Sequence, residues 1–326
     1  MCTAISDHTS GFLFGRTLDL ERSYSERVIL TPRRLQLEFL YQKSISEHHA
    51  ILGIGILHGD MPLYFDAINE AGLAIAALNF PSSALYREAK PRKLNLASFE
   101  IIPYLLASCS TLADAKAILN EVNITGESVT PELPASPLHW LIADKSGSSV
   151  LESTCEGIKI HDNPFGTLTN EPPFAYHAAS VANYLHLSSA PPENKLAPSI
   201  DLMPHSRGAG AIGLPGDFSS PSRFLRAVFM KEHTDKAKNK DVAVSRFFHI
   251  MESVSVPHGA IKTDRGESVC TVYTSCADPI GMSYYFTTYA SRRIREITPT
   301  REQIEASSIR SVPISEPEEI AGVGLN

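Results

Sequence analysis

The chain opens with two short apolar runs that a polar turn separates. Residues 2–6 and 12–17 are rich in strand-forming residues and flank the segment DHTSG, which predicts a pair of neighbouring strands. Similar runs predict further strands at 28–31, 51–57, 73–78, 139–143, 150–153, 271–276 and 282–288. The last four form two hairpins, around DKSGS and around ADPIG.

Helical periodicity is confined to four segments between these strand runs. We expect helices at 99–107, from Thr111 onwards, at 222–233 and at 241–254. Thr111 suits the N-cap position, because Asp114 follows it in the first turn. The order of strands, helices, strands, helices and strands favours a layered α+β fold with antiparallel sheets over regular βαβ alternation.

Composition limits the classes of function. The 326 residues are 43% hydrophobic and 20% charged, with a net charge of -7 and no sustained basic run, which argues against nucleic acid binding. We expect one domain over residues 1–326, with a polar, proline-containing surface excursion near 184–198 and a loose tail from about residue 312.

The N-terminal sequence MCTAISDHTS has no basic segment followed by an apolar run, and we find no apolar stretch long enough to span a bilayer. The five cysteines are an odd number, which argues against a disulfide framework. We therefore expect a cytoplasmic protein without a membrane partner.

Cys2 is the first candidate for chemistry. Removal of Met1 would leave a thiol and a free α-amine on one residue. Their ordinary pKa values, about 8.5 and about 8, allow one residue to supply both nucleophile and base. The competing interpretation is a chance second residue in a frayed terminus.

Four further residues follow in short motifs. In GRTLD, Arg16 can stabilise a thiolate and Asp19 can hold the ammonium, if a bend after Arg16 brings both beside the terminus. A surface salt bridge is the alternative. Asn79 and Asn170 end apolar or β-prone runs, where an amide can face a developing oxyanion, although turn formation also explains them.

The segment SRGAGAIGLPGDFSSPSRF contains Gly208-x-Gly210-x-x-Gly213, but no strand precedes these glycines and no helix follows them directly. We therefore reject a dinucleotide site. Arg223 lies in the first turn of the predicted helix, an unfavourable place for a cation without an anionic or polarised partner. The sequence lacks the HExxH spacing of a zinc site and the GxSxG elbow of serine hydrolases.

Taken together, MCT, FGRTLD, LNFP, LTNEPPF, GLPGDFSSPSRF and YTSC resemble, in order and spacing, the choloylglycine hydrolase family, which includes bile salt hydrolases and penicillin V acylases. The resemblance covers most of the chain, from Cys2 to about Tyr289. It implies a four-layer αββα sandwich and amide hydrolysis through a cysteine acyl-enzyme, with no metal or cofactor. It also implies a homotetramer in which the excursion takes part in assembly.

The same resemblance assigns roles to the motif residues. Cys2 becomes the nucleophile and its amine the base, while Arg16 and Asp19 tune it. Asn79 and Asn170 help to form the oxyanion hole, and Arg223 supports the site electrostatically. The catalytic residues expected from the resemblance are therefore Cys2, Arg16, Asp19, Asn79, Asn170 and Arg223.

For the substrate, the resemblance favours conjugated bile salts, because Asn79 looks like the bile salt group. Arg16, Leu18, Phe65 and Asn79 are candidates for lining the cleft, although Leu18 and Phe65 also suit a core. Arg207, in a Ser-Arg-Gly loop that resembles the taurine-preferring type, can pair with a sulfonate or remain a solvated surface cation.

Three other functions stay open from the sequence. The first is a penicillin V acylase or another N-acyl amide hydrolase. The second is an acyltransferase that passes the acyl group to an amine. The third is a non-catalytic protein that binds bile-acid-like amphiphiles, which the complete set of motif residues disfavours.

Overall fold

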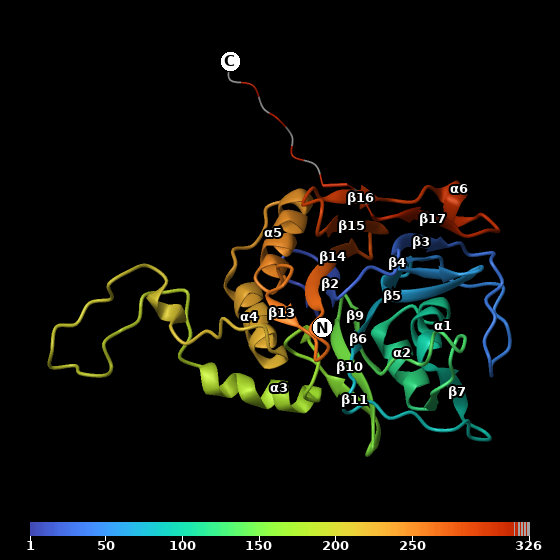
Figure 1. Cartoon of the computed structure of the whole chain (residues 1–326), viewed down its shortest axis with the longest axis horizontal. Coiled ribbons are helices and arrows are strands. Elements are labelled where there is room, and N and C mark those ends of the chain that lie inside the picture. Colours follow the sequence, from blue (N-terminus) through green and yellow to red (C-terminus); the bar gives the residue numbers. More distant parts are fainter. Residues whose placement is uncertain (316, 319, 321, 323, 325–326) are drawn as a thin grey trace.

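The structure is a computed structural model that describes residues 1–315, 317–318, 320, 322 and 324. Its core consists of four layers (Figure 1). Two helices, α4 and α5, cover the outer face of a seven-stranded sheet, which packs on an eight-stranded sheet, and α1 and α2 cover the far face of the second sheet. The expectation of an αββα sandwich with antiparallel sheets is confirmed.

The seven-stranded sheet carries the N-terminus on an inner strand. Its path is β12-β1-β2-β14-β15-β16, and β13 adds to β14. The bounds are β1 (Cys2–Asp7), β2 (Leu13–Leu20), β12 (Thr167–Leu168), β13 (Ile261–Lys262), β14 (Ser268–Asp278), β15 (Ser283–Thr288) and β16 (Arg295–Ile297). β1 and β2 pair without a shift, which places Cys2 opposite Leu18.

The eight-stranded sheet runs β11-β10-β9-β6-β5-β4-β3-β17. Its strands are β3 (Arg27–Thr31), β4 (Ile51–His58), β5 (Met61–Asn69), β6 (Ala74–Asn79), β9 (Leu138–Asp144), β10 (Gly147–Thr154), β11 (Gly157–Asp162) and β17 (Arg310–Pro313). In β6, Leu78 packs between the two sheets and Ala77 packs toward the helices. Because both faces are covered, β6 reads as a continuous apolar run.

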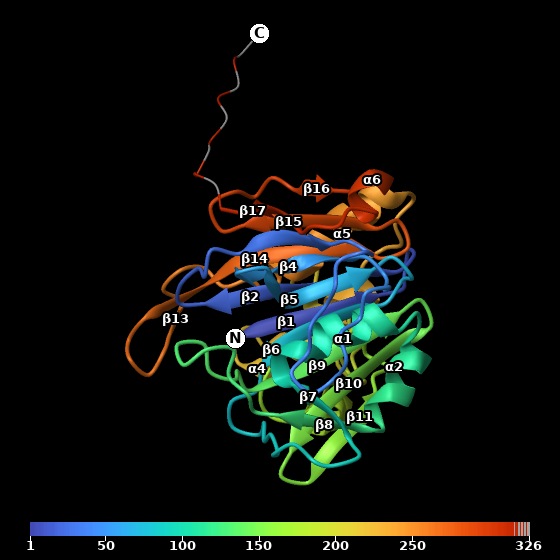
Figure 2. The same cartoon turned by 90° about the vertical axis from the view of Figure 1, so that its right-hand side faces the viewer.

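The helices are α1 (Ile101–Ser108), α2 (Leu112–Leu119), α3 (Phe174–Ser180), α4 (Ser220–His233), α5 (Lys240–Glu252) and α6 (Arg301–Ile304). Thr111 caps α2, and its side chain accepts a hydrogen bond from the Asp114 N–H, as expected. β7 (Leu94–Ala97) and β8 (Val122–Thr125) form a separate parallel pair below α1 and α2 (Figure 2).

Some boundaries differ from the expectations. α4 begins at Ser220 and not at Ser222, because Pro221 fits the first turn of a helix. β5 and α3 were not expected. β5 contains Pro62 and the buried Asp66, which interrupt the apolar pattern that predicts a strand.

The surface excursion is longer than the sequence suggested. From Leu185 to Ser219 the chain has no strand and only a short 3-10 helix, at Ala209–Ala211, and it projects from the body beside α3 and α4 (Figure 1). At the other end, Ile314 is buried beyond β17, so packed structure continues past residue 312. Within the expected tail, residues 316, 319, 321, 323 and 325–326 lie outside the described residues.

Within the described part of the chain, no helix combines the length and the apolar character that crossing a membrane demands.

Candidate active site

The N-terminus lies inside the sheet and not at its frayed edge. Cys2 begins β1, between β12 and β2, and is 2% exposed. The Asp19 N–H donates to the Met1 carbonyl over 2.9 Å, and the Met1 amine donates to the Asp19 carbonyl over 2.6 Å. Pairing with β2 therefore fixes the backbone on both sides of the Cys2 thiol.

Asn170 connects Cys2 to Asn79. The Cys2 N–H donates to Asn170 Oδ1 over 2.8 Å, and Asn170 Nδ2 donates to the Asn79 carbonyl over 2.7 Å. Asn79 ends β6, and its side chain is exposed. One N–H of the Asn170 amide and the whole Asn79 amide are therefore available to a carbonyl oxygen brought to Cys2.

Arg223 reaches the same point from α4. It donates to the Cys2 carbonyl, to Thr3 Oγ1 over 2.7 Å and to Asn170 Oδ1 over 2.8 Å, and its Nε donates to the Phe218 carbonyl. The side chain is fully buried, and burial lowers its pKa, although Asp19 and Cys2 oppose that effect. These acceptors supply the polarised partner that a cation in the first turn of a helix requires.

The Arg16 side chain extends from β2 toward the second sheet. Its guanidinium donates to the carbonyls of Phe65 (3.1 Å) and Ala77, while Nη2 is buried without a hydrogen bond among the described residues. Burial lowers the pKa of Arg16, but its electrostatic interactions with Cys2, Tyr273, Asp66 and Asp19 outweigh that effect and raise the pKa overall. A buried cation with an uncommitted N–H is suited to stabilise a thiolate.

Asp19 lies on the opposite face of β2 from Arg16. Its side chain accepts from Thr271 Oγ1 over 2.7 Å and from Thr17 Oγ1 over 3.2 Å. Burial raises the pKa of Asp19, and the charges of Arg223 and of the N-terminal amine oppose the rise. β2 is one continuous strand, without a bend after Arg16. The side chains of Arg16 and Asp19 lie near the N-terminus on opposite faces of this strand.

The residues that the sequence predicts to line the substrate cleft differ in their burial and in their location. Leu18 is 4% exposed and packs in the same core cluster as Cys2, and Phe65 is half-buried against that cluster. Arg207 is exposed on the projecting segment. The other five expected catalytic residues thus lie around Cys2, whereas Arg207 belongs to a part of the chain that projects from the body.

Sequence reasoning missed a buried carboxylate behind Arg16. Asp66, on β5, accepts hydrogen bonds from Tyr273 Oη (2.6 Å), Ser275 Oγ (2.8 Å) and Tyr284 Oη, all on the other sheet. Burial raises the pKa of Asp66, while the charge of Arg16 lowers it. The available signal was a lone Asp within an apolar run; the motif YTSC supported the family resemblance, but the sequence does not connect it with Asp66.

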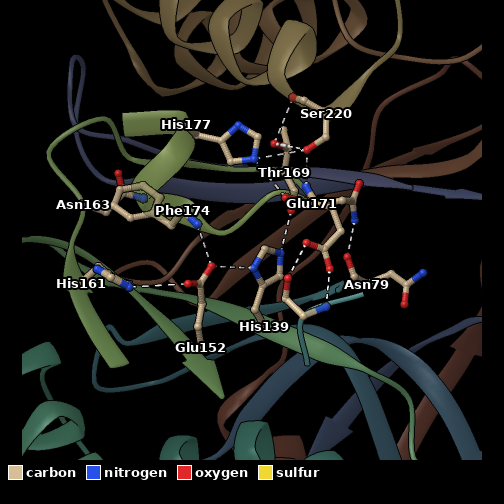
Figure 3. Close-up of polar contacts among 12 residues, drawn as sticks. Asn79, His139, Glu152, His161, Asn163, Thr169, Glu171, Phe174, His177 and Ser220 are labelled. Atoms are coloured by element: carbon tan, nitrogen blue, oxygen red, sulfur yellow. Dashed lines mark hydrogen bonds and ion pairs between the residues drawn. The ribbon is translucent and has the colours of Figure 1, made fainter. Parts of the chain in front are cut away.

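A second missed group surrounds Asn170. Its N–H donates to Ser220 Oγ over 2.8 Å, and its carbonyl lies 3.0 Å from His177 Nε2. The preceding carbonyl, of Thr169, lies 2.8 Å from His139 Nε2 (Figure 3). His139 and His177 carried no motif that distinguishes them from ordinary core histidines.

Comparison with known proteins agrees with this geometry. A profile described as linear amide C-N hydrolases, choloylglycine hydrolase family, matches residues 2–311. A bile salt hydrolase/transferase from Lactiplantibacillus plantarum is 41% identical over 314 residues, which cover 96% of this chain and 97% of the relative.

Solved structures show the same architecture. A conjugated bile acid hydrolase from Clostridium perfringens is 32% identical, with a TM-score of 0.90 over 99% of this chain and 100% of its own. A penicillin V acylase from Agrobacterium tumefaciens shares the fold at 19% identity, with a TM-score of 0.75 over 98% of this chain and 93% of its own. The chain belongs to the choloylglycine hydrolase family of linear amide C-N hydrolases.

Proposed function

We propose that this chain hydrolyses the amide bond of conjugated bile salts and releases taurine or glycine together with the free bile acid. The observation that carries the proposal is the hydrogen-bonded cluster of Cys2, Asn170 and Arg223, in which Asn170 Oδ1 accepts from both of the others. The relatives named as bile salt or conjugated bile acid hydrolases support the substrate class.

The mechanism starts with removal of Met1, which converts the Cys2 amide nitrogen into an α-amine. That amine accepts the thiol proton, and Cys2 Sγ attacks the carbonyl carbon of the substrate. The oxyanion forms beside Asn79 and Asn170 and is stabilised by their amide N–H groups. The ammonium then returns its proton to the leaving amine as the C–N bond breaks, which leaves a thioester on Cys2.

Hydrolysis of the thioester completes the cycle. The same α-amine accepts a proton from water, the resulting hydroxide attacks the thioester carbonyl, and the thiol leaves with that proton as the bile acid dissociates. Asn170 Oδ1, 2.8 Å from Cys2 N, holds the amine in place throughout. Arg16 and Arg223 stabilise negative charge, and Asp19 stabilises the ammonium.

The test is release of amino acid from taurocholate and glycocholate, with penicillin V in parallel, by protein whose N-terminal Cys2 has been verified. We expect release of taurine or glycine with little cleavage of penicillin V. Cleavage of penicillin V alone would keep the mechanism and overturn the substrate. Formation of new amides when amines are added would show transfer beside hydrolysis, an activity that the name of the Lactiplantibacillus plantarum relative includes.

For assembly, we propose a homotetramer in which the projecting segment, residues 185–215, contacts other copies. The segment exposes large apolar side chains that a monomer would leave in water: Leu185, Leu196, Ile200, Leu202, Met203 and Ile212. Such a concentration is typical of an interaction surface.

The projecting segment also carries Arg207, so we propose that Arg207 meets the taurine sulfonate of a substrate bound to a neighbouring copy. Replacement of Arg207 by Ala should lower kcat/KM for taurocholate more than for glycocholate, because a sulfonate accepts charge-assisted hydrogen bonds. Equal losses for both substrates, or no loss, would remove this role for Arg207.

A further inference from the structure

The two strand ends that carry Asn79 and Asn170 meet at one buried histidine. His139 lies on β9, which pairs with β6 so that His139 is opposite Leu78, next to Asn79. Its ring stacks on Phe80, with centroids 4.2 Å apart and an interplanar angle of 6°. Its Nε2 lies 2.8 Å from the Thr169 carbonyl, next to Asn170. His139 therefore contacts the neighbour of each amide residue.

Glu152 orients this histidine from the other side. On β10, Glu152 lies 3.3 Å from His139 Nδ1 and also accepts from the Phe174 N–H at the start of α3, over 2.8 Å (Figure 3). Both side chains are buried, at 0% and 1% exposure. Each ring nitrogen of His139 thus faces an oxygen atom, of Glu152 on one side and of Thr169 on the other, and the two contacts together fix the orientation of the ring.

The contacts around Asn170 leave it little freedom. Its N–H and carbonyl are hydrogen-bonded to Ser220 and His177. Its side chain is hydrogen-bonded to Cys2 through Oδ1 and to Asn79 through Nδ2. The position of this segment relative to β6 is held in two further ways. Glu171 accepts from the N–H groups of Ser82 and Ser83, which follow β6. His139 is stacked on the residue after Asn79 and hydrogen-bonded to the residue before Asn170.

We propose that Glu152 and His139 form a positioning pair that fixes the Asn79 and Asn170 amides relative to one another and to Cys2. Neither residue touches the substrate. The pair acts on the geometry of the oxyanion site, so its loss lowers kcat and leaves KM unchanged. This inference rests on the proposed amide hydrolysis for its kinetic test and on the contacts alone for its structural test.

The kinetic test compares two replacements of the same histidine. His139→Phe keeps a ring on Phe80 but removes the donor to the Thr169 carbonyl, whereas His139→Gln keeps an N–H donor and removes the ring. We expect His139→Phe to lower kcat for glycocholate by about 10- to 100-fold, as a displacement of about 1 Å can. His139→Gln keeps the hydrogen bond and loses the stack on Phe80, so it should lose less of kcat than His139→Phe, and KM should change little in both.

His48→Phe is the matched control. Like His139, His48 has a partner for each ring nitrogen, here the backbone carbonyls of His49 and Leu35, each at 2.7 Å, but it lies outside the cluster around Cys2. It should lower the melting temperature without lowering kcat. An equal loss of kcat in His48→Phe, or in His139→Phe and His139→Gln alike, would show a general structural effect and overturn the proposal.

A second variant guards against misfolding of His139→Phe. Glu152→Gln is isosteric and keeps the acceptor for the Phe174 N–H, but it removes the negative charge that lies beside His139 Nδ1. We expect a lower kcat with unchanged KM, and an unchanged kcat would overturn the proposal.

The structural test needs no substrate. In crystals of Glu152→Gln or His139→Phe, the hydrogen bond from Asn170 Nδ2 to the Asn79 carbonyl should lengthen or break, and an unmoved Asn170 would overturn the proposal. If the unaltered chain hydrolyses no conjugated bile salt, the proposed function fails, while a displaced Asn170 in the variant crystals would still support the positioning pair.

Discussion

The residues around Cys2 are held in place by hydrogen bonds to several different elements. Asn170 Oδ1 accepts from the Cys2 N–H of β1 and from Arg223 of α4, and Arg16 donates to carbonyls of β5 and β6. Burial makes each of these contacts strong, because water does not compete for the charged and polar groups. Replacing any one of them removes hydrogen bonds from groups that remain buried.

Glu152 gives a pH-dependent prediction at this scale. Burial raises the pKa of Glu152, but hydrogen bonds from His139 and from the Phe174 N–H outweigh it, with His161 adding to them, and the pKa is lowered overall. The stability that ionised Glu152 contributes is therefore complete above its unfolded pKa of about 4.3 and is lost as pH falls through the lower, folded value.

Urea unfolding of Glu152→Gln and of the unaltered protein at several pH values between 7 and 3 measures this contribution. The difference in free energy of unfolding should be largest near pH 7 and should shrink below about pH 4.3. A difference that stays constant with pH would contradict the lowered pKa.

Some residues could be identified from the sequence and others could not, for a physical reason. Cys2 and Arg16 could be singled out from their chemistry and Arg223 from its place in the first turn of a helix, and the family resemblance then suggested a role for each. Asp66 and His139 were missed because their roles come from partners distant in the sequence: Asp66 accepts from Tyr273, 207 positions away, and His139 contacts Thr169, 30 positions away.

At the scale of elements, the pairing of β2 with β14 sets the position of Arg16. A Cβ on Gly15 would lie 2.0 Å from the Ser275 carbonyl on β14, so this strand pair approaches too closely for any other residue. The glycine of FGRTLD is thus a requirement of the sheet, whereas the sequence alone related that motif only to the chemistry of Arg16 and Asp19.

Gly15→Ala should therefore displace β2 from β14 and lower the free energy of unfolding by about 1–3 kcal/mol, the usual cost of overpacking. Chemical denaturation measures the loss. Gly147→Ala is a contrasting variant at a hairpin turn, where nothing lies within 4 Å of the added Cβ and the cost comes from its positive φ of 151°. Only Gly15→Ala should also lower kcat, because only it moves Arg16.

The edges of elements were harder to predict than their existence. The strand patterns at 2–6, 28–31 and 51–57 gave β1, β3 and β4 to within one residue at each end. β5 was not predicted because Pro62 and Asp66 interrupt its apolar pattern. Both residues are accommodated by neighbours that only the folded sheet supplies. α3 was not predicted because its seven residues follow two prolines in a segment that resembles a loop.

At the scale of the whole molecule, the body contains the candidate active site, whereas we assign the projecting segment to assembly. The two sheets bury Cys2 between layers, whereas the segment over residues 185–215 extends into solvent (Figure 1). Its apolar side chains include Leu196 at 93% exposure and Met203 at 77%. Our proposal of a homotetramer assigns these side chains to contacts between copies.

Sedimentation equilibrium tests that assignment. The unaltered chain should sediment as a tetramer, and the double replacement Leu196→Asp and Met203→Asp should shift it to smaller species, because charges oppose burial in an apolar interface. A monomeric unaltered chain, or a double variant that remains tetrameric, would contradict the assigned role of the segment.

The central claim is that catalysis needs Cys2 as the first residue, with its amine free. It is tested by preparing the chain with a removable extension ahead of Cys2 and measuring glycocholate hydrolysis before and after proteolysis exposes Cys2, with Cys2→Ala as the control. Our account predicts no turnover before cleavage, full turnover afterwards and none in Cys2→Ala, because an amide nitrogen cannot accept the thiol proton. Equal turnover before and after cleavage would contradict it.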